Sequence, residues 1–223
     1  MDKLFLRILF FLTLATLFSA PVLAQTITIE DFTTGNYGPG SSITVRVNVS
    51  GACINSLTNK FRLFLSDASG SFANEEEIGS FTGFYTTFVN GRIPLTQATG
   101  TQYKLRVKAD AAPAAIPPET AVFRIVSNPG ALIRINTERL VSTNEEVFGN
   151  CAVAEDKTLT LTNSTGAGIT VNATVFNELT NSFNTPVSFA SSPDQPLAIT
   201  TAHYTLKATA TNAAGVISTR SYM

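Results

Sequence analysis

The feature that most constrains the fold is an alternation of apolar and polar residues with a period of two, which recurs after residue 25. Successive side chains of a β-strand point to opposite faces, so this period is typical of half-buried strands. The clearest runs lie at 43–49, 61–65, 105–107, 122–125, 132–135 and 158–162. Thr, Val, Ile and Phe dominate them, and Gly, Pro, Asn, Asp and Ser separate them. Because helical periodicity is almost absent, the sequence predicts an all-β fold of antiparallel strands.

Residues 1–24 have the three parts of a secretory signal peptide. Lys3 and Arg7 precede an apolar run. Residues 22–24 then place small or medium-sized side chains before the expected cleavage site, which follows Ala24. The run is too short to span a bilayer comfortably, and the residue at the cleavage junction is Gln25 rather than a cysteine, so neither a retained anchor nor a lipoprotein is expected. We expect export through the Sec pathway and a secreted or cell-surface location.

The charge of the mature chain excludes two classes of partner. Cleavage removes two of the 15 basic residues and one of the 16 acidic residues, which leaves 13 against 15 without a basic block. Nucleic acids and anionic membranes need clustered positive charge, so neither is expected as a partner. No second apolar run approaches membrane-spanning length. The remaining 199 of the 223 residues suit two domains of roughly 100 residues.

An internal repeat supports this division. Residues 103–109 (YKLRVKA) and 204–210 (YTLKATA) share Tyr, Leu, a basic residue and Ala at the same positions, 101 residues apart. That spacing is about the length of one immunoglobulin-like (Ig-like) domain. Two earlier pairs of segments follow the same order in the two halves. Residues 40–48 resemble 155–163 as the second strand of each half, and 66–72 resemble 178–183 as the turn after the third strand. Chance similarity between Thr-rich strands is the alternative explanation.

The repeat predicts two tandem Ig-like antiparallel β-sandwich domains after the cleaved signal peptide. The first covers 25–126, the second covers 131–223, and 127–130 (SNPG) forms a hinge because Pro and Gly end strands. Tyr103 and Tyr204 are expected to be tyrosine corners, whose hydroxyls bond back to the preceding turn.

Several motifs in the first half resemble a β-sandwich module of exported, multi-domain surface proteins of the Bacteroidota. They are 37–45 (YGPGSSITV), 64–72 (FLSDASGSF), Ile78-Gly79 and 100–107 (GTQYKLRV). Such modules occur in gliding-motility proteins or in proteins that carry a sorting domain. Residues 131–223 resemble a divergent Ig-like relative, in which 204–215 are similar to an F–G hairpin. The resemblance implies that further domains follow in a longer natural chain and that the second domain is truncated.

The expected function is that of a non-catalytic structural or adhesive module, a spacer or a unit that contacts surface proteins or glycans. The alternative is a carbohydrate-binding accessory module of a polysaccharide-degrading system. Its candidate contacts are Phe84, Tyr85 and Phe88, in the segment 81–88 (FTGFYTTF). This alternative predicts that at least two of the three rings are exposed and coplanar. Alternation instead buries Phe81 and Phe88 and leaves Tyr85 exposed, and we prefer that interpretation.

The sequence shows no recognisable catalytic, cofactor-binding or metal-binding motif, and none is expected. The single histidine, His203, starts a predicted strand without a neighbouring carboxylate, so we interpret it as a strand-edge residue. An enzyme would need His203 or a pair of carboxylates in a cleft. The acidic segment 74–77 (NEEE) offers oxygen ligands for calcium, but it lacks the spacing of a calcium loop, which favours a solvated turn.

The two cysteines, Cys53 and Cys151, raise the question of a disulfide in an exported chain. In an end-to-end arrangement of two sandwiches they lie at far ends, beyond the roughly 7 Å that bridged Cα atoms allow. We therefore expect them to be unpaired, and only a folded-back pair of domains would join them.

Overall fold

The protein is described by a computed structural model that covers residues 25–51, 54, 56–111, 116–136, 157–165, 169–177, 182–183, 187–189, 195–199 and 204–223. Within these ranges the regular structure consists of strands alone. The all-β prediction is confirmed. Among the same residues, no helical segment has the length and apolar character that crossing a bilayer requires.

The first unit comprises the strands β1 to β9. Their bounds are β1 Thr26–Phe32, β2 Asn36–Tyr37, β3 Ser42–Ser50, β4 Lys60–Leu65, β5 Glu76–Thr82, β6 Thr87–Arg92, β7 Gly100–Tyr103, β8 Leu105–Ala109 and β9 Phe123–Ile125. They form sheets with the orders β1-β3-β6, β5-β4-β8 and β2-β9-β7. The pairs are antiparallel except β2 with β9, which is parallel and departs from the purely antiparallel prediction.

The second unit comprises β10 to β17. Their bounds are β10 Ile135–Asn136, β11 Lys157–Asn163, β12 Val171–Asn177, β13 Ser182–Phe183, β14 Val187–Phe189, β15 Gln195–Ile199, β16 Tyr204–Thr211 and β17 Ile217–Tyr222. They form the sheets β10-β11-β15 and β13-β12-β16-β17, with β14 beside β12. The repeated segments occupy corresponding places, because β8 pairs with β4 and β16 pairs with β12. The count of two domains stays a prediction.

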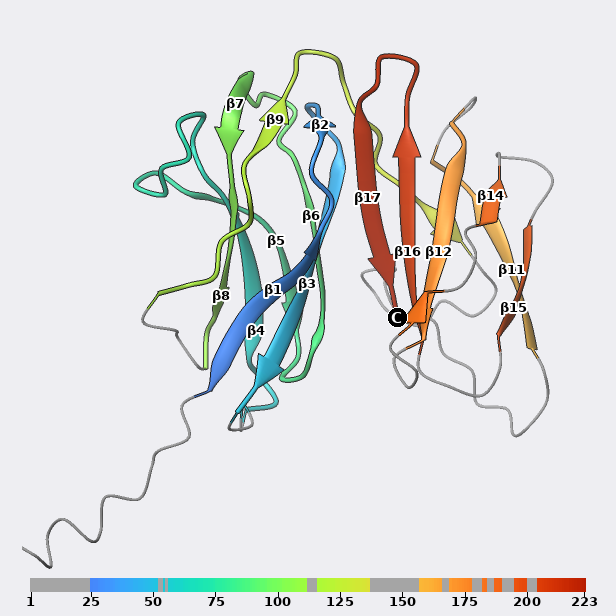
Figure 1. Ribbon diagram of the computed structural model, residues 1–223, viewed down its shortest axis with the longest axis horizontal. Helices are drawn as coiled ribbons and strands as arrows, with labels where there is room; N and C mark the ends of the chain where they lie inside the picture. The colour runs from blue at the N-terminus through green and yellow to red at the C-terminus, as the bar shows by residue number, and fades with distance from the viewer. Residues whose placement is uncertain are drawn as a thin grey trace, which may run out of the picture.

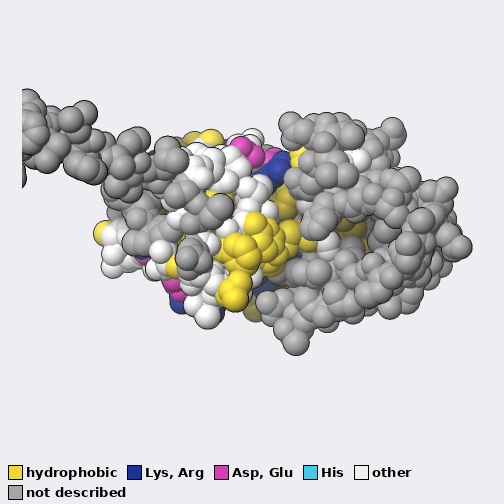
Figure 2. Space-filling view, turned by 90° about the horizontal axis from the view of Figure 1, so that it is seen from below, with side chains coloured by type: hydrophobic (Ala, Val, Ile, Leu, Met, Phe, Trp, Pro, Cys, Tyr) yellow, Lys and Arg dark blue, Asp and Glu magenta, His cyan; other side chains and the backbone are white. Residues whose placement is uncertain are grey.

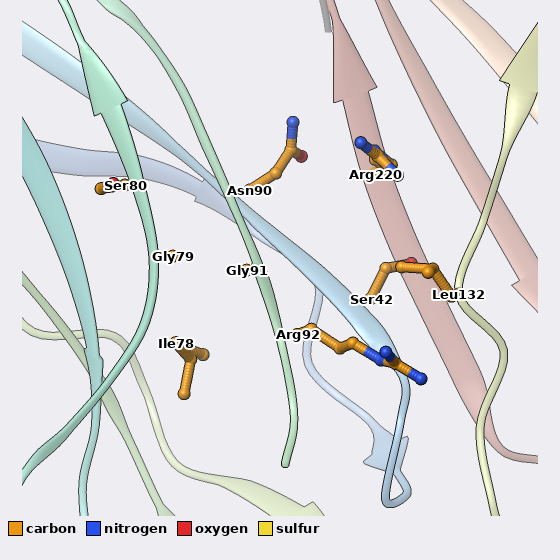
Figure 3. Close-up of a pocket in the computed structure, with 9 residues that line it drawn as sticks. All are labelled: Ser42, Ile78, Gly79, Ser80, Asn90, Gly91, Arg92, Leu132 and Arg220. Atoms are coloured by element: carbon orange, nitrogen blue, oxygen red, sulfur yellow. The ribbon is translucent and has the colours of Figure 1, made fainter. Parts of the chain in front are cut away.

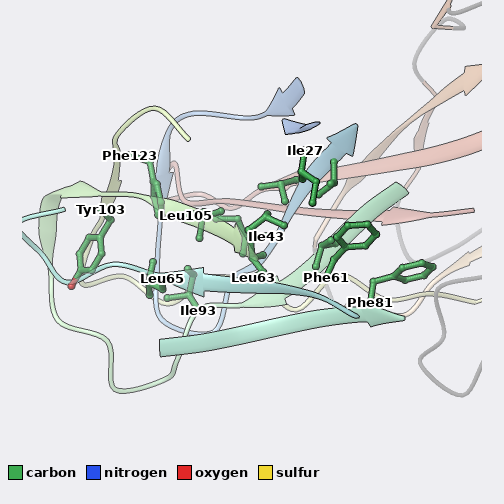
Figure 4. Close-up of a cluster of buried hydrophobic side chains, with 14 of the residues drawn as sticks. Ile27, Ile43, Phe61, Leu63, Leu65, Phe81, Ile93, Tyr103, Leu105 and Phe123 are labelled. Atoms are coloured by element: carbon green, nitrogen blue, oxygen red, sulfur yellow. The ribbon is translucent and has the colours of Figure 1, made fainter. Parts of the chain in front are cut away.

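Alternation explains which side chains form the core of the first unit. In β4, Phe61, Leu63 and Leu65 are buried, whereas the residues between them are only partly covered. The buried faces of β3 and β8 meet this row, and Figure 4 shows Ile43 and Leu105 among the side chains packed with it. The second unit has a separate cluster, which includes Val171, Ala208 and Tyr222 among others. Burial of such aliphatic and aromatic surface is the main contribution to folding of each unit.

The predicted F–G hairpin is present as β16 and β17. Asn212 starts the turn, and its side-chain oxygen accepts hydrogen bonds from the backbone nitrogens of Ala214 and Val216, both at 3.0 Å. Gly215 has a φ of 73°, a left-handed conformation that a residue without Cβ adopts most readily. Asn and Gly at these positions therefore set the turn.

The two units lie side by side, with β17 next to the β1-β3-β6 sheet (Figure 1). Residues 41–45 at the start of β3 are all buried, although alternation predicts one exposed face. Ile43 and Val45 face the core of the first unit, whereas Ser42 and Thr44 face the second unit. The end-to-end arrangement assumed for the cysteines is therefore wrong. Cys53 and Cys151 themselves lie outside the described residues.

The segment predicted as a hinge is hydrogen-bonded to both units. The Gly130 nitrogen donates to Pro39 O at 2.9 Å, and the side chain of Asn212 donates to Pro129 O at 3.0 Å. Immediately after it, Ser42 N donates to Ala131 O at 2.9 Å. These contacts make 127–130 a fixed connection in this structure rather than a free hinge.

Candidate functional site

One end of the first unit gathers three connections between strands. In the β4–β5 and β4–β8 pairs, Lys60 lies opposite Thr82 and Phe61 lies opposite Ala109. The connections at 51–59, 83–86 and 110–122 therefore all start or finish at this end, which we call the loop end. Loops at the end of a sandwich are the usual places for binding residues, because a rigid framework positions them.

A buried asparagine holds the three connections together. Asn59 donates from its side chain to Gly83 O at 2.6 Å and accepts from Ala111 N at 2.9 Å. Its own carbonyl accepts from Gly83 N at 3.0 Å. Because Asn59 is fully buried, these bonds satisfy a side chain that water cannot reach. The loop end is thus preorganised by one amide.

A threonine fixes the far side of the β5–β6 turn. The Thr86 hydroxyl accepts from Val49 N and donates to the side-chain oxygen of Asn48, both at 3.0 Å. The turn at 83–86 is consequently bonded on one side to Asn59 and on the other side to β3. Its two aromatic side chains project from a backbone that is held at both ends.

Phe84 and Tyr85 are exposed at this turn, by 39% and 45%. Their rings are 5.6 Å apart and nearly perpendicular, with an interplanar angle of 83°. The buried ring of Phe81 supports Tyr85 edge-on at 6.2 Å. Leu57 and Ile116, in the neighbouring connections, are also strongly exposed. Figure 2, which views the molecule from this end, shows hydrophobic side chains gathered near the middle of the face.

The flat aromatic platform required by the carbohydrate-binding hypothesis is not formed by Phe84, Tyr85 and Phe88. Two rings are exposed but perpendicular, and Phe88 is only 5% exposed. Phe81 packs in the core, as alternation predicts. Phe88 is buried for a different reason, because it lies on the outer face of β6, where the guanidinium of Arg46 contacts it and the Phe176 ring of the second unit.

The other sequence-predicted residues are spread over the structure. Tyr103 is buried, and its hydroxyl donates to Ala98 O, five residues earlier, at 2.8 Å, the contact that a tyrosine corner makes. Gln97 donates to the same hydroxyl at 2.8 Å. Tyr204 begins β16, but its side chain lies outside the described part of the chain, as does the whole of His203.

The acidic segment 74–77 lies among cations. Glu75 forms ion pairs with Lys108 and Arg106, and Glu77 pairs with Arg62 at 3.0 Å. Within the described ranges, no group of three or more potential ligands is arranged to hold a metal ion. The sheet surface formed by β5, β4 and β8 is thus a set of paired charges.

The contact between the two units contains a row of buried polar groups beside apolar contacts of Ile217 and Met223, and we call it the seam. The seam is formed by the outer faces of β3 and β6 on one side and by β12, β16 and β17 on the other. Thr44 N donates to the Thr219 hydroxyl at 3.1 Å, and the Thr44 hydroxyl donates to that of Ser221 at 3.2 Å. All three side chains are at most 2% exposed, so the hydroxyls are paired with one another instead of with water.

Asn90 makes the most specific contact of the seam. Its side-chain nitrogen donates to Ser221 O at 2.8 Å, and its side-chain oxygen accepts from Ser221 N at 2.9 Å. Lys207 adds an ion pair with Asp31 at 2.6 Å. The sequence did not predict the roles of Asn59 and Asn90. A single asparagine in a Thr- and Asn-rich chain forms no motif from which its hydrogen-bond partners could be inferred.

Known proteins offer little for comparison. No protein family matches the sequence, and no curated protein is similar to it. Among solved structures, a mutant of Salmonella alpha-2-macroglobulin aligns with 91% of this chain and 15% of its own, at 12% identity and a TM-score of 0.30. The same protein reacted with methylamine gives 12% identity, coverage of 91% and 14%, and a TM-score of 0.30.

Escherichia coli alpha-2-macroglobulin activated by porcine elastase aligns with 89% of this chain and 20% of its own, at 10% identity and a TM-score of 0.29. The chain thus spans about a fifth or less of these proteins. Similarity at this level transfers neither fold nor activity, so the assignment of function depends on the geometry of the chain itself.

Proposed function

We propose that this protein is a non-catalytic structural and adhesive module of an exported, surface-displayed protein, and that it presents the loop end to a partner. The observation that carries the proposal is the seam. It joins the two units through buried, mutually paired hydroxyl and amide groups. Such directional bonds favour one relative orientation, because a slip of one strand would leave them unpaired.

The loop end supplies the contact surface of this module. Phe84, Tyr85, Leu57 and Ile116 are large hydrophobic side chains on an end held in shape by Asn59. Exposed hydrophobic side chains grouped at one end of a rigid framework commonly mark a protein-binding surface. The perpendicular rings of Phe84 and Tyr85 suit insertion into an apolar pocket of a partner protein better than stacking on a sugar face.

Export and surface display complete the proposal. They are supported by the signal-peptide pattern of residues 1–24 and by the resemblance of the motifs at 37–107 to surface modules of the Bacteroidota. Protein recovered from the medium or from the cell surface is expected to begin at Gln25. N-terminal sequencing of that protein tests this expectation.

The test is attachment of beads coated with the mature chain to a panel of protein-coated and glycan-coated surfaces under flow. The double variant Phe84→Ser/Tyr85→Ser is expected to lower attachment to protein-coated surfaces at least about tenfold, since aromatic anchors carry much of the energy of such contacts. The control is Leu95→Ser, which removes an exposed hydrophobic side chain in the β6–β7 connection, outside the loop end. The control should attach like the natural chain.

A second variant separates contact from positioning. Asn59→Ala keeps both aromatic residues but removes the side-chain hydrogen bonds to Gly83 and Ala111 that hold the loop end, so attachment should fall while the seam bonds persist. Equal attachment of the double variant and its control would overturn the loop end as the contact surface. Attachment confined to glycan-coated surfaces would favour the carbohydrate-binding alternative instead.

A further inference from the structure

Asn90 and Gly91 form the only Asn-Gly pair in the chain. Asparagine followed by glycine is the pair that loses its side-chain amide most readily, because glycine has no Cβ to hinder attack by its own backbone nitrogen. Asparagine is for this reason among the thermolabile residues of proteins. The pair lies in β6, and its asparagine makes the most specific contact of the seam.

The packing of the first unit explains why glycine follows Asn90. A Cβ atom at Gly91 would lie 3.0 Å from Leu63 and 3.1 Å from Ile78, whose side chains fill the space beside β6. On the neighbouring strand, a Cβ atom at Gly79 would lie 2.0 Å from Asn90 O. Strands β5 and β6 therefore approach each other through glycines. The labile pair is a consequence of this close packing.

The closed seam holds the side chain of Asn90 away from the reaction. The side-chain nitrogen donates to Ser221 O at 2.8 Å and the side-chain oxygen accepts from Ser221 N at 2.9 Å, so the amide is directed toward β17 (Figure 3). Gly91 lies opposite Ile43 in the ladder with β3, which keeps the backbone extended. Because the Gly91 nitrogen must reach Cγ of Asn90, the amide has to leave Ser221 before it can react.

Water has access to the pair. Asn90 and Gly91 both line a cleft of about 340 Å³ between the units, with Arg92 of β6 and Arg220 of β17 among the other lining residues (Figure 3). One water molecule needs only about 10–15 Å³ of such space. Hydrolysis at this position is therefore not prevented by burial, and the bonds to Ser221 are what restrain the amide.

We propose that Asn90 is a deamidation site that the closed seam protects, and that deamidation makes opening of the seam irreversible. When the seam opens, the Gly91 nitrogen loses its proton and forms a bond to Cγ of Asn90, and the side-chain nitrogen leaves as ammonia. Water then opens the resulting succinimide ring at one of its two carbonyl groups, which yields aspartate or isoaspartate. The only co-reactant is water.

Either product disrupts the contact with β17. Ionised aspartate has acceptor oxygens and no donor, so one oxygen would face Ser221 O without a proton between them. The carboxylate would also lose hydration when the seam closes, and the single bond from Ser221 N does not offset that loss. Isoaspartate adds one carbon to the main chain of β6 and disturbs its pairing with β3. A chain modified at Asn90 therefore stays open.

The experiment is peptide mapping by mass spectrometry after incubation of the mature chain at mildly alkaline pH. Trypsin releases residues 63–92 as one peptide, because no Lys or Arg lies between Arg62 and Arg92. The peptide contains two asparagines, Asn90 and the exposed Asn74, which is followed by glutamate and serves as the internal reference.

Two rates are compared within this peptide. In the chain unfolded in guanidinium chloride, Asn90 should be deamidated at least about tenfold faster than Asn74, because glycine does not hinder the attack. In the folded chain the rate at Asn90 should be at least about tenfold lower than in the unfolded chain, the protection expected from two hydrogen bonds. Gly91→Ala in the unfolded chain should bring the rate at Asn90 down to that at Asn74.

Thr219→Val weakens the seam at a residue that does not contact Asn90. The Thr219 hydroxyl accepts from Thr44 N, and without it this buried nitrogen loses its partner. The open population, and with it the rate at Asn90, should rise about fivefold or more. The matched control is Thr101→Val, which removes a hydroxyl from an exposed residue of β7 and should leave the rate unchanged. Equal rates in the two variants would contradict protection by the seam.

Asn90→Asp reproduces one product and tests whether the opening is irreversible. The amide of Ser221 should exchange with solvent at least about tenfold faster in this variant than in the natural chain. The deamidated fraction of an aged natural sample should show the same fast exchange after return to the original buffer.

Three further results would overturn the proposal. They are deamidation of Asn90 no faster than that of Asn74 in the unfolded chain, equal rates at Asn90 in the folded and unfolded chains, and natural exchange of the Ser221 amide in Asn90→Asp. None of these measurements involves a partner at the loop end. The deamidation site and the proposed adhesive function therefore fail independently.

Discussion

The interior of the first unit and the seam beside it are both buried, but they are built from opposite kinds of side chain. The interior consists of Ile, Val, Leu, Phe and Tyr that pack without directional bonds, apart from the hydroxyls of the tyrosines. The seam contains Ser, Thr and Asn side chains that form hydrogen bonds across the two units. Apolar burial stabilises almost any compact arrangement, whereas paired polar groups stabilise one arrangement. The interior thus provides stability and the seam provides orientation.

The largest effect should come from the interior. Leu63 is fully buried at the centre of β4, so Leu63→Ala removes apolar burial and leaves a cavity. We expect the free energy of unfolding to fall by about 2–5 kcal/mol, measured by urea denaturation followed by circular dichroism. Leu95→Ala, at a residue that is 68% exposed, should change it by less than about 0.5 kcal/mol. A small loss for Leu63→Ala would contradict the division of roles.

A smaller but more specific effect should come from the seam. Asn90→Ala removes both bonds to Ser221 and leaves two backbone groups of β17 unpaired, at a loss of about 1–3 kcal/mol. The amide of Ser221 should exchange faster with solvent, and residual dipolar couplings should report a wider range of orientations between the units. Asn74→Ala, at an exposed residue, serves as the control. Unchanged couplings would mean that the seam does not set the orientation.

The smallest effect should come from an ion pair on the surface of the first unit, outside both the interior and the seam. The hydrogen bond from Arg106 is the main cause that lowers the pKa of Glu119, with a further contribution from Lys104. A lowered pKa stabilises the folded state above the ordinary value near 4, and this contribution is lost as the pH falls through the folded-state value. Because solvent screens the pair, the contribution should be below about 1 kcal/mol.

Glu119→Gln tests this assignment. Between pH 5 and pH 2 the thermal midpoint of the variant should fall less than that of the natural chain. The two midpoints should differ most near neutral pH, where the natural chain has the ion pair. The uncharged bonds of the seam should persist through this range, since Asn, Ser and Thr do not titrate there. A natural chain whose midpoint is flat between pH 5 and pH 2 would exclude a stabilising role for the Glu119 pair.

The sequence predicts the interior well because its pattern is local. Alternation identifies the buried faces of β4 and β8, and the 101-residue repeat places β8 and β16 in corresponding positions. The same alternation predicts that Ser42, Thr44 and Arg46 face solvent, and here it is wrong. A period of two distinguishes two faces of a strand but does not tell which outer face a second sheet covers.

The remaining features depend on contacts between residues far apart in the chain. Asn90 and Ser221 are separated by 131 positions, and Arg92 and Arg220 come to one cleft only because the units lie side by side. The aromatic segment was predictable in part, since Phe81 is buried and Tyr85 is exposed as expected. The angle between the rings of Phe84 and Tyr85 follows from the turn geometry, which composition does not specify.

The side chain of Asn90 has a consequence for the solubility of the chain. β17 is the last strand of its sheet, and Ser221 directs its backbone groups away from β16 toward Asn90. An uncovered edge of this kind can recruit strands from other molecules and start aggregation. The amide of Asn90 occupies two of the hydrogen-bonding positions that an incoming strand would use, so an orienting contact also acts as protection against unwanted self-association.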